Sequence, residues 1–198
     1  MTILWFLLWF VLSAIILGAT AWSTIILFQQ KRAWKAYAKT NGLTFHRGTL
    51  IGPCEVEGVI DGFQVSLFTA EQQNPDARKN RKVTSVQVNL PKGFVDSVAA
   101  GTSQTLPFLK SLTIISPHEL ESEQWNANHF IYSRNKAAVD LFLTSERLEM
   151  LRKILSMKNA DVLVLLDESE GVIRMETSSP LKDADQIDKV VKATILRF

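Results

Sequence analysis

Few residues of this chain could carry out metal or nucleophilic chemistry. Its three histidines, His46, His118 and His129, stand far apart in the sequence, and Cys54 is the single cysteine. A zinc site needs three or four such ligands at short spacings, and neither a C-x-x-C nor an H-E-x-x-H pattern occurs. His118-Glu119 begins like the second pattern, but the second histidine is missing. We therefore expect no bound metal.

Covalent catalysis and cofactor binding have equally little support. Cys54 follows Pro53 in a strand-like stretch, where a small buried thiol is the usual role of cysteine. No Gly-x-Ser-x-Gly elbow occurs, and the glycines lack the spacing of phosphate-binding or dinucleotide-binding loops. Carboxylates two positions apart occur at Glu55/Glu57 and at Glu119/Glu121/Glu123. They would share an exposed strand face, so we expect no catalytic residue and no cofactor.

Two groups of basic residues are the remaining candidates for binding. Lys31, Arg32, Lys35 and Lys39 form the first group, and Arg78, Lys79, Arg81 and Lys82 form the second. Beside a membrane, such residues attract anionic lipid headgroups, by about 1 kcal/mol each, or an acidic partner. The alternative for the second group is a solubilising hairpin tip. Because the net charge is only +2 and no stacking aromatics interleave with these residues, we expect no nucleic acid.

The first 28 residues form an apolar run without a charged side chain. A helix rises 1.5 Å per residue and needs about 20 apolar residues to cross a hydrocarbon layer of ~30 Å. The sequence therefore predicts a transmembrane helix over 1–28, a helical juxtamembrane extension over 29–42 and one soluble domain over 43–198. The alternative is a signal peptide cleaved after Ala19-Thr20-Ala21, but signal peptides begin with basic residues and have a shorter apolar core.

The flanks of this run predict its orientation. Trp5 and Trp9 stand near one end, and Trp22 and Trp34 near the other, as in the aromatic belts of membrane interfaces. Their alternative role is simply to add hydrophobicity, and Trp34 also suits a packing role. Basic residues follow the run and none precedes it. Since positive flanks stay cytoplasmic, we expect the amino terminus outside and residues 31–198 in the cytoplasm, preferably at a bacterial inner membrane, with a mitochondrial membrane left open.

Alternating apolar and polar residues predict the strands of the soluble domain. Asp61-Gly62 between two such stretches is a two-residue hairpin turn. The predicted strands cover 43–47, 54–60, 63–68, 84–90, 112–116, 129–133, 162–166 and 172–176. Their succession, with helices interspersed late in the chain, predicts an α+β fold: an N-terminal transmembrane helix, then one domain with a largely antiparallel sheet and two to three packed helices.

Helical periodicity and capping residues predict where those helices lie. Ala33, Trp34, Tyr37 and Ala38 form an apolar stripe within 29–40, and Asn41-Gly42 is a helix stop. Later caps are Asn135 for a short helix to Leu143 and Thr144 or Ser145 for the next, and Ser179-Pro180 starts the last helix. The last helix has a buried stripe at Ile187, Val190, Val191, Thr194 and Ile195.

Three stretches of the chain also carry a resemblance. They are Trp34-x-x-Tyr37-Ala38-x-x-x-Gly42-Leu43-x-Phe45, Val56-Glu57-Gly58-x-x-x-Gly62-Phe63-x-Val65 and Phe130 through Leu143-Thr144-x-x-Arg147-x-x-x-Leu151, followed by paired strands around Asp167 and Gly171. Together they resemble small single-pass membrane-anchored bacterial proteins of uncharacterised function. The chain departs from that pattern at residues 125–129, where a Gly-Asp and a Phe-Asp pair are common. The resemblance implies the layout and no site residues.

These patterns favour a binding or structural role over catalysis. We expect a membrane-anchored protein that is an accessory partner of a membrane protein complex, or that forms homo-oligomers. One alternative is a cytoplasmic-face module for anionic lipids, built from the two basic groups. The other is a membrane-tethered enzyme without a recognisable motif.

Overall fold

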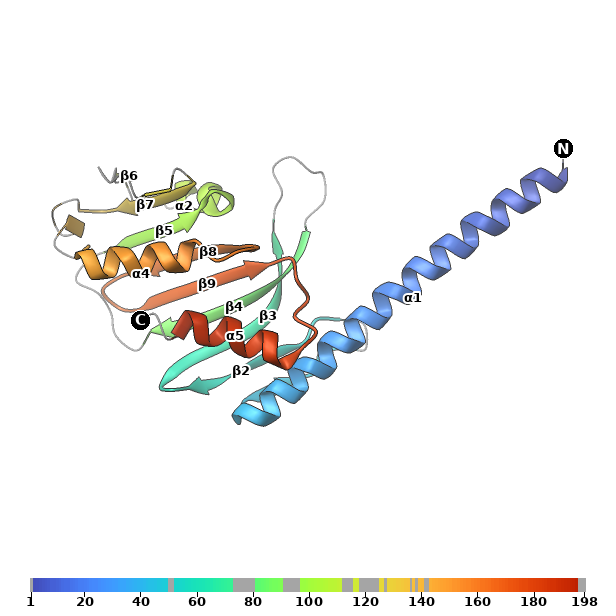
Figure 1. Ribbon diagram of the computed structural model, residues 1–198, viewed down its shortest axis with the longest axis horizontal. Helices are drawn as coiled ribbons and strands as arrows, with labels where there is room; N and C mark the ends of the chain where they lie inside the picture. Colours follow the sequence, from blue (N-terminus) through green and yellow to red (C-terminus); the bar gives the residue numbers. More distant parts are fainter. Residues whose placement is uncertain are drawn as a thin grey trace.

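The computed structural model describes residues 2–49, 52–72, 81–90, 97–111, 116–117, 125–126, 128–135, 137, 139–140 and 143–195 (Figure 1). Helix α1 (Thr2–Asn41) is continuous and extends far beyond the rest of the fold. Within the described residues, it is the one helix long and apolar enough to cross a membrane. Its residues 3–25 are exposed.

The other end of α1 belongs to the hydrophobic core. Trp34, Tyr37 and Ala38 are buried and pack in the same cluster as α5, β1 and β2, which α1 contacts. The predicted stripe and the predicted stop are both confirmed. Gly42 adopts φ 68°, and the amide of Leu43 donates to the carbonyl of Ala38 at 2.8 Å, which closes the helix.

The described strands form one nine-stranded sheet in the order β1-β2-β3-β4-β9-β8-β5-β7-β6, in which each pairing is antiparallel. The strands are β1 (Thr44–His46), β2 (Glu55–Ile60), β3 (Phe63–Gln72), β4 (Arg81–Leu90), β5 (Val98–Thr102), β6 (Ser116–Pro117), β7 (His129–Ser133), β8 (Ala160–Leu166) and β9 (Gly171–Thr177). The predicted α+β class is confirmed, and so is the hairpin turn, because Asp61 and Gly62 have positive φ and Ile60 pairs with Phe63.

Helices lie on both faces of this sheet. The end of α1, α4 (Ser145–Leu155) and α5 (Ala184–Ile195) pack on one face, over the main core. Figure 1 shows α4 and α5 on that face. The 3-10 turn η1 (Ser103–Thr105) and α2 (Leu106–Ser111) lie against β5 and β8 on the other face, where Leu109 is fully buried. Farther along that face, β3, β4 and β9 carry polar side chains.

Local sequence signals explain where the elements differ from the prediction. The last helix begins at Ala184 rather than at Ser179-Pro180. Asp183 caps it, since its side chain accepts from the amide of Asp185 at 3.2 Å and its carbonyl accepts from Ile187. The predicted cap Thr144 of α4 is confirmed. Strand β5 was not predicted, and the predicted strand over 112–116 lies outside the described residues except at its last position.

Candidate functional site

The structure separates the eight basic residues that the sequence singles out. Lys31 and Lys82 line one groove between α1 and the ends of β3 and β4. Arg32, Lys35, Lys39 and Arg81 are exposed and do not line it. Arg78 and Lys79 lie outside the described residues.

The structure also separates the four tryptophans that the sequence assigns to membrane interfaces. Trp5, Trp9 and Trp22 are exposed on the protruding part of α1. Trp34 is 0% exposed and lies in the main core, so its assignment to a membrane interface is wrong and its packing role is correct. The reason is that the sheet and α5 cover α1 from about Gln30 onward, before the helix reaches Trp34.

A second groove of about 500 Å³ lies on the face of the sheet opposite the main core. We call it the sheet-face groove. Its floor comes from β8 and β9, one end from the end of β3, and one wall from η1 and α2. Phe108 of α2 is 47% exposed beside it. The lining residues are Glu71, Gln72, Gln104, Thr105, Pro107, Phe108, Asp161, Leu163, Arg174 and Glu176.

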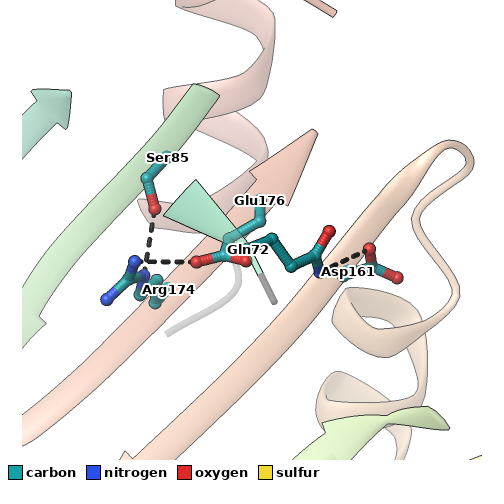
Figure 2. A network of polar contacts seen from close by, with 5 residues as sticks. All are labelled: Gln72, Ser85, Asp161, Arg174 and Glu176. Atoms are coloured by element: carbon teal, nitrogen blue, oxygen red, sulfur yellow. Dashed lines mark hydrogen bonds and ion pairs between the residues drawn. The ribbon is translucent and has the colours of Figure 1, made fainter. Parts of the chain in front are cut away.

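Strand pairing brings its polar side chains together (Figure 2). Asp161 on β8 is directly opposite Glu176 on β9, and Glu176 is opposite Ser85 on β4. Because alternate residues of a strand point to the same face, Arg174 shares this face with Glu176. Gln72 reaches in from β3, and its side-chain amide donates to Asp161 Oδ2 at 3.3 Å.

Arg174 is held in place on three sides. Its Nη2 lies 2.7 Å from Glu176 Oε1, and its Nε donates to Ser85 Oγ at 3.0 Å. The guanidinium carbon also lies 5.2 Å from the centre of the Phe68 ring, within cation–π range. Arg174 therefore forms part of the floor of the groove and has a defined orientation.

The groove carries an excess of negative charge. Asp161 and Glu176 contribute carboxylates from the floor, and Glu71, directly opposite Lys82 at the end of β3, lines one end; Arg174 is the one cation among the described lining residues. Gln72, Gln104 and Thr105 add amide and hydroxyl groups, and Phe108 and Leu163 add apolar surface. Such a lining suits a cationic group with an apolar neighbour, which is the chemistry of a Lys or Arg side chain in a peptide segment.

The predicted candidates for metal chemistry do not converge in the part of the chain that the structure describes. No group of three or more His, Cys, Asp or Glu side chains there could hold a metal ion. Cys54 is buried, and burial raises the pKa of its thiol. His118 lies outside the described residues. His46 pairs with Glu57 at 2.7 Å on the exposed β1–β2 surface, far in the sheet order from His129 on β7.

Sequence patterns missed the sheet-face groove because its residues come from five elements. Gln72 and Asp161, for example, are 89 residues apart in the chain and meet only through the strand order. A weak signal was present in Arg174 and Glu176, which interrupt the hydrophobic pattern of β9 with opposite charges. Comparisons with protein-family models, curated proteins and solved structures found no match for this chain.

Proposed function

We propose that this protein is a membrane-anchored binding protein, an accessory partner of a membrane protein complex, whose sheet-face groove takes a basic segment of that partner. The observation that carries the proposal is the groove itself, with three carboxylates and one cation among its described lining residues. A positively charged side chain would lie beside Asp161 and Glu176, and its apolar neighbour would contact Phe108.

The anchor part of the proposal rests on α1. Residues 3–25 are apolar and exposed, so about 35 Å of helix has no cover from the domain. A bilayer would bury that surface. Basic residues follow the helix at Lys31 and Arg32, which favours a cytoplasmic domain at a bacterial inner membrane. With α1 in the membrane and the domain at its cytoplasmic face, the sheet-face groove would lie within reach of the cytoplasmic segments of neighbouring membrane proteins.

A variant at Asp161 tests the groove with little risk to the fold. Asp161 is only half-buried and lies at the edge of the groove, so Asp161→Asn removes a charge and retains an acceptor for Gln72. Asp161→Lys reverses the charge. The full chain, tagged after Phe198, would be extracted in a gentle detergent, and co-purifying proteins would be quantified by mass spectrometry.

We expect a stoichiometric membrane partner with the wild type, less with Asp161→Asn and none with Asp161→Lys. Glu149→Lys is the matched control, because Glu149 is an exposed carboxylate on α4, on the opposite face of the sheet. It should retain the partner. Equal recovery from all four proteins would rule out the groove as the binding site. A homodimer that Asp161→Lys dissociates would identify a second copy of the chain as the partner.

A further inference from the structure

The groove that contains Lys31 and Lys82 lies at the junction of α1 and the sheet, on the face opposite the sheet-face groove. We call it the junction groove. It has a volume of about 480 Å³, within the range of small-molecule sites. Residues of α1 form one wall, and the ends of β3 and β4, the turn before β2 and the loop after β9 form the rest. The lining residues are Ser23, Ile26, Leu27, Gln30, Lys31, Gly52, Pro53, Cys54, Thr69, Glu71, Lys82, Val83, Thr84, Ser178 and Pro180.

The position of this groove along α1 determines where it would lie relative to a membrane. The helix is exposed from Ile3 through Ile25, and the domain first covers it at Ile26 and Leu27. If residues 3–25 cross the hydrocarbon layer, the groove opens where the acyl chains end and the headgroups begin. The inference therefore rests on the anchor part of the proposed function, and goes beyond it by assigning a second site.

Along α1, the lining of the groove changes from apolar to basic. A phospholipid changes in the same order, from its acyl chains to its phosphate. Ile26 and Leu27 present apolar surface on the membrane side, and Lys31 follows about one helical turn farther in. Lys82 comes from β4 on the opposite wall, directly across the strand pair from Glu71. Lys31, Glu71 and Lys82 are the charged residues among the described lining residues of this groove, and Glu71, at the end of β3, lines both grooves.

The backbone partly orients Lys31. Its Nζ donates to the carbonyl of Thr49 at 2.5 Å. Burial raises the pKa of the Cys54 thiol, and the positive charge of Lys31 opposes that rise. Among the described lining residues, Lys31 and Lys82 are two cations against the one carboxylate of Glu71, so this groove favours an anion.

We propose that the junction groove binds the phosphate of an anionic phospholipid between Lys31 and Lys82, with an acyl chain of that lipid along Ile26 and Leu27 of α1. The lipid would fix the domain against the membrane in one orientation. The groove would prefer a lipid with a net negative headgroup over a zwitterionic one, because a choline or ethanolamine ammonium would meet the same two lysines.

The matched pairs of basic residues give a sharp test. Lys31→Gln/Lys82→Gln removes both lysines of the groove. Arg32→Gln/Arg81→Gln removes the same charge from adjacent exposed positions that do not line it. Full-chain protein would be reconstituted into vesicles of equal parts phosphatidylcholine and phosphatidylglycerol, extracted in a gentle detergent, and analysed for retained lipid by native mass spectrometry.

We expect the wild type and the arginine control to retain phosphatidylglycerol selectively, and the lysine variant to lose about fivefold in selectivity for each lysine removed. If the double variant does not fold, Lys82→Gln alone, at an exposed position, tests the loss of selectivity for one lysine. Lys31→Arg/Lys82→Arg should retain the selectivity. Equal loss in the lysine and arginine variants would overturn the site, since it would show only general surface attraction.

Two further outcomes separate the causes of failure. Displacement of the lipid by ~10 mM inorganic phosphate would identify a site for free anions and overturn the lipid assignment. Wild-type protein that washes off the vesicles at alkaline pH would overturn the anchor, and the lipid site with it. Stable insertion with no lipid selectivity would overturn the lipid site alone.

Discussion

Arg174 and Glu176 lie two residues apart on β9 and form a 2.7 Å ion pair on the face of the sheet opposite the main core. The side chain of Glu176 is 15% exposed and that of Arg174 is 32% exposed, so the pair is largely removed from water. Ser85 and Phe68 hold the guanidinium from the other strands. The pair therefore gives the floor of the sheet-face groove a fixed geometry, beside the carboxylate of Asp161 on β8.

A double-mutant cycle measures how strongly this pair is coupled. Arg174→Met leaves Glu176 without its charged partner in a largely buried position, and we expect a loss of about 1–3 kcal/mol in unfolding free energy. Glu176→Gln should lower the unfolding free energy less in the Arg174→Met variant than in the wild type. The difference, which is the coupling energy, should be about 1 kcal/mol. Urea unfolding of the full chain in detergent, followed by circular dichroism, gives all four values. Strictly additive losses would contradict the coupling.

Tyr37 carries a buried hydroxyl that has no hydrogen-bond partner among the described residues. Burial, with a smaller contribution from Asp188, raises the pKa of Tyr37 far above its usual value. Tyr37→Phe removes the unpaired hydroxyl and retains the ring, so we expect the unfolding free energy to rise by about 1 kcal/mol. Tyr37→Leu, which also removes the ring, should destabilise the fold. A thermal unfolding midpoint for Tyr37→Phe below that of the wild type would reveal a partner for this hydroxyl.

Gly101 permits the close approach of η1 and α2 to the sheet. A Cβ at this position would lie 2.2 Å from Thr105 Oγ1, 3.2 Å from Leu109 Cδ1 and 3.3 Å from the carbonyl oxygen of Val162. We therefore expect Gly101→Ala to lower the unfolding free energy by about 1–3 kcal/mol. Adding Thr105→Ala removes the nearest atom and should restore part of the loss. No recovery in the double variant would place the strain at Leu109 or Val162 instead.

His129 makes the stability of the fold depend on pH. Burial lowers its pKa below the usual value of 6.5, against a smaller opposing effect of a backbone hydrogen bond with Leu155. Between the lowered folded pKa and 6.5 the unfolded chain binds more protons, so the unfolding free energy falls as the pH drops through this window. The slope is at most about 1.4 kcal/mol per pH unit. Above pH 7 the residue has no such effect.

His129→Phe removes the titrating group and keeps a ring for the edge-to-face contact with Trp125, so it is the variant to compare with the wild type. Urea unfolding at pH 7.5 and pH 5.5 should show a smaller difference for the variant than for the wild type. An equal pH dependence in both proteins would mean that other groups are responsible.

Much of the fold could be predicted because its signals are local. The Asp61-Gly62 turn, the stripe from Ala33 to Ala38 and the cap at Thr144 each depend on residues within a few positions. Strand β5 escaped prediction because Val-Ala-Ala-Gly-Thr has no alternation of apolar and polar residues. Both faces of β5 are buried, with Val98 and Ala100 in the main core and Ala99 in the smaller one, so both faces require apolar side chains.

The two grooves could not be predicted from these local signals. Lys31 and Lys82 belong to separate basic groups in the sequence, and only the packing of α1 against β1, β2 and α5 brings them to one groove. In the sequence, Asp161 stands just before the apolar run 162–166, where it resembles an ordinary polar flank, although it is the second residue of β8. Its place in the groove depends on the strand order that brings β3 near β8 and on the position of η1 and α2, which local patterns do not specify.

Photo-crosslinking tests most directly the proposal that the sheet-face groove binds a basic segment of a membrane protein. Phe108 is the natural reporter, because it is an exposed ring at the rim of the groove. A photo-crosslinking phenylalanine analogue placed at Phe108 in the full chain, in its native membranes, should couple to a membrane partner at a segment that contains Lys or Arg. Adding Asp161→Lys should abolish that product, whereas the same analogue at Glu149 should not yield it. No product from position 108, or the same product with and without Asp161→Lys, would contradict the claim.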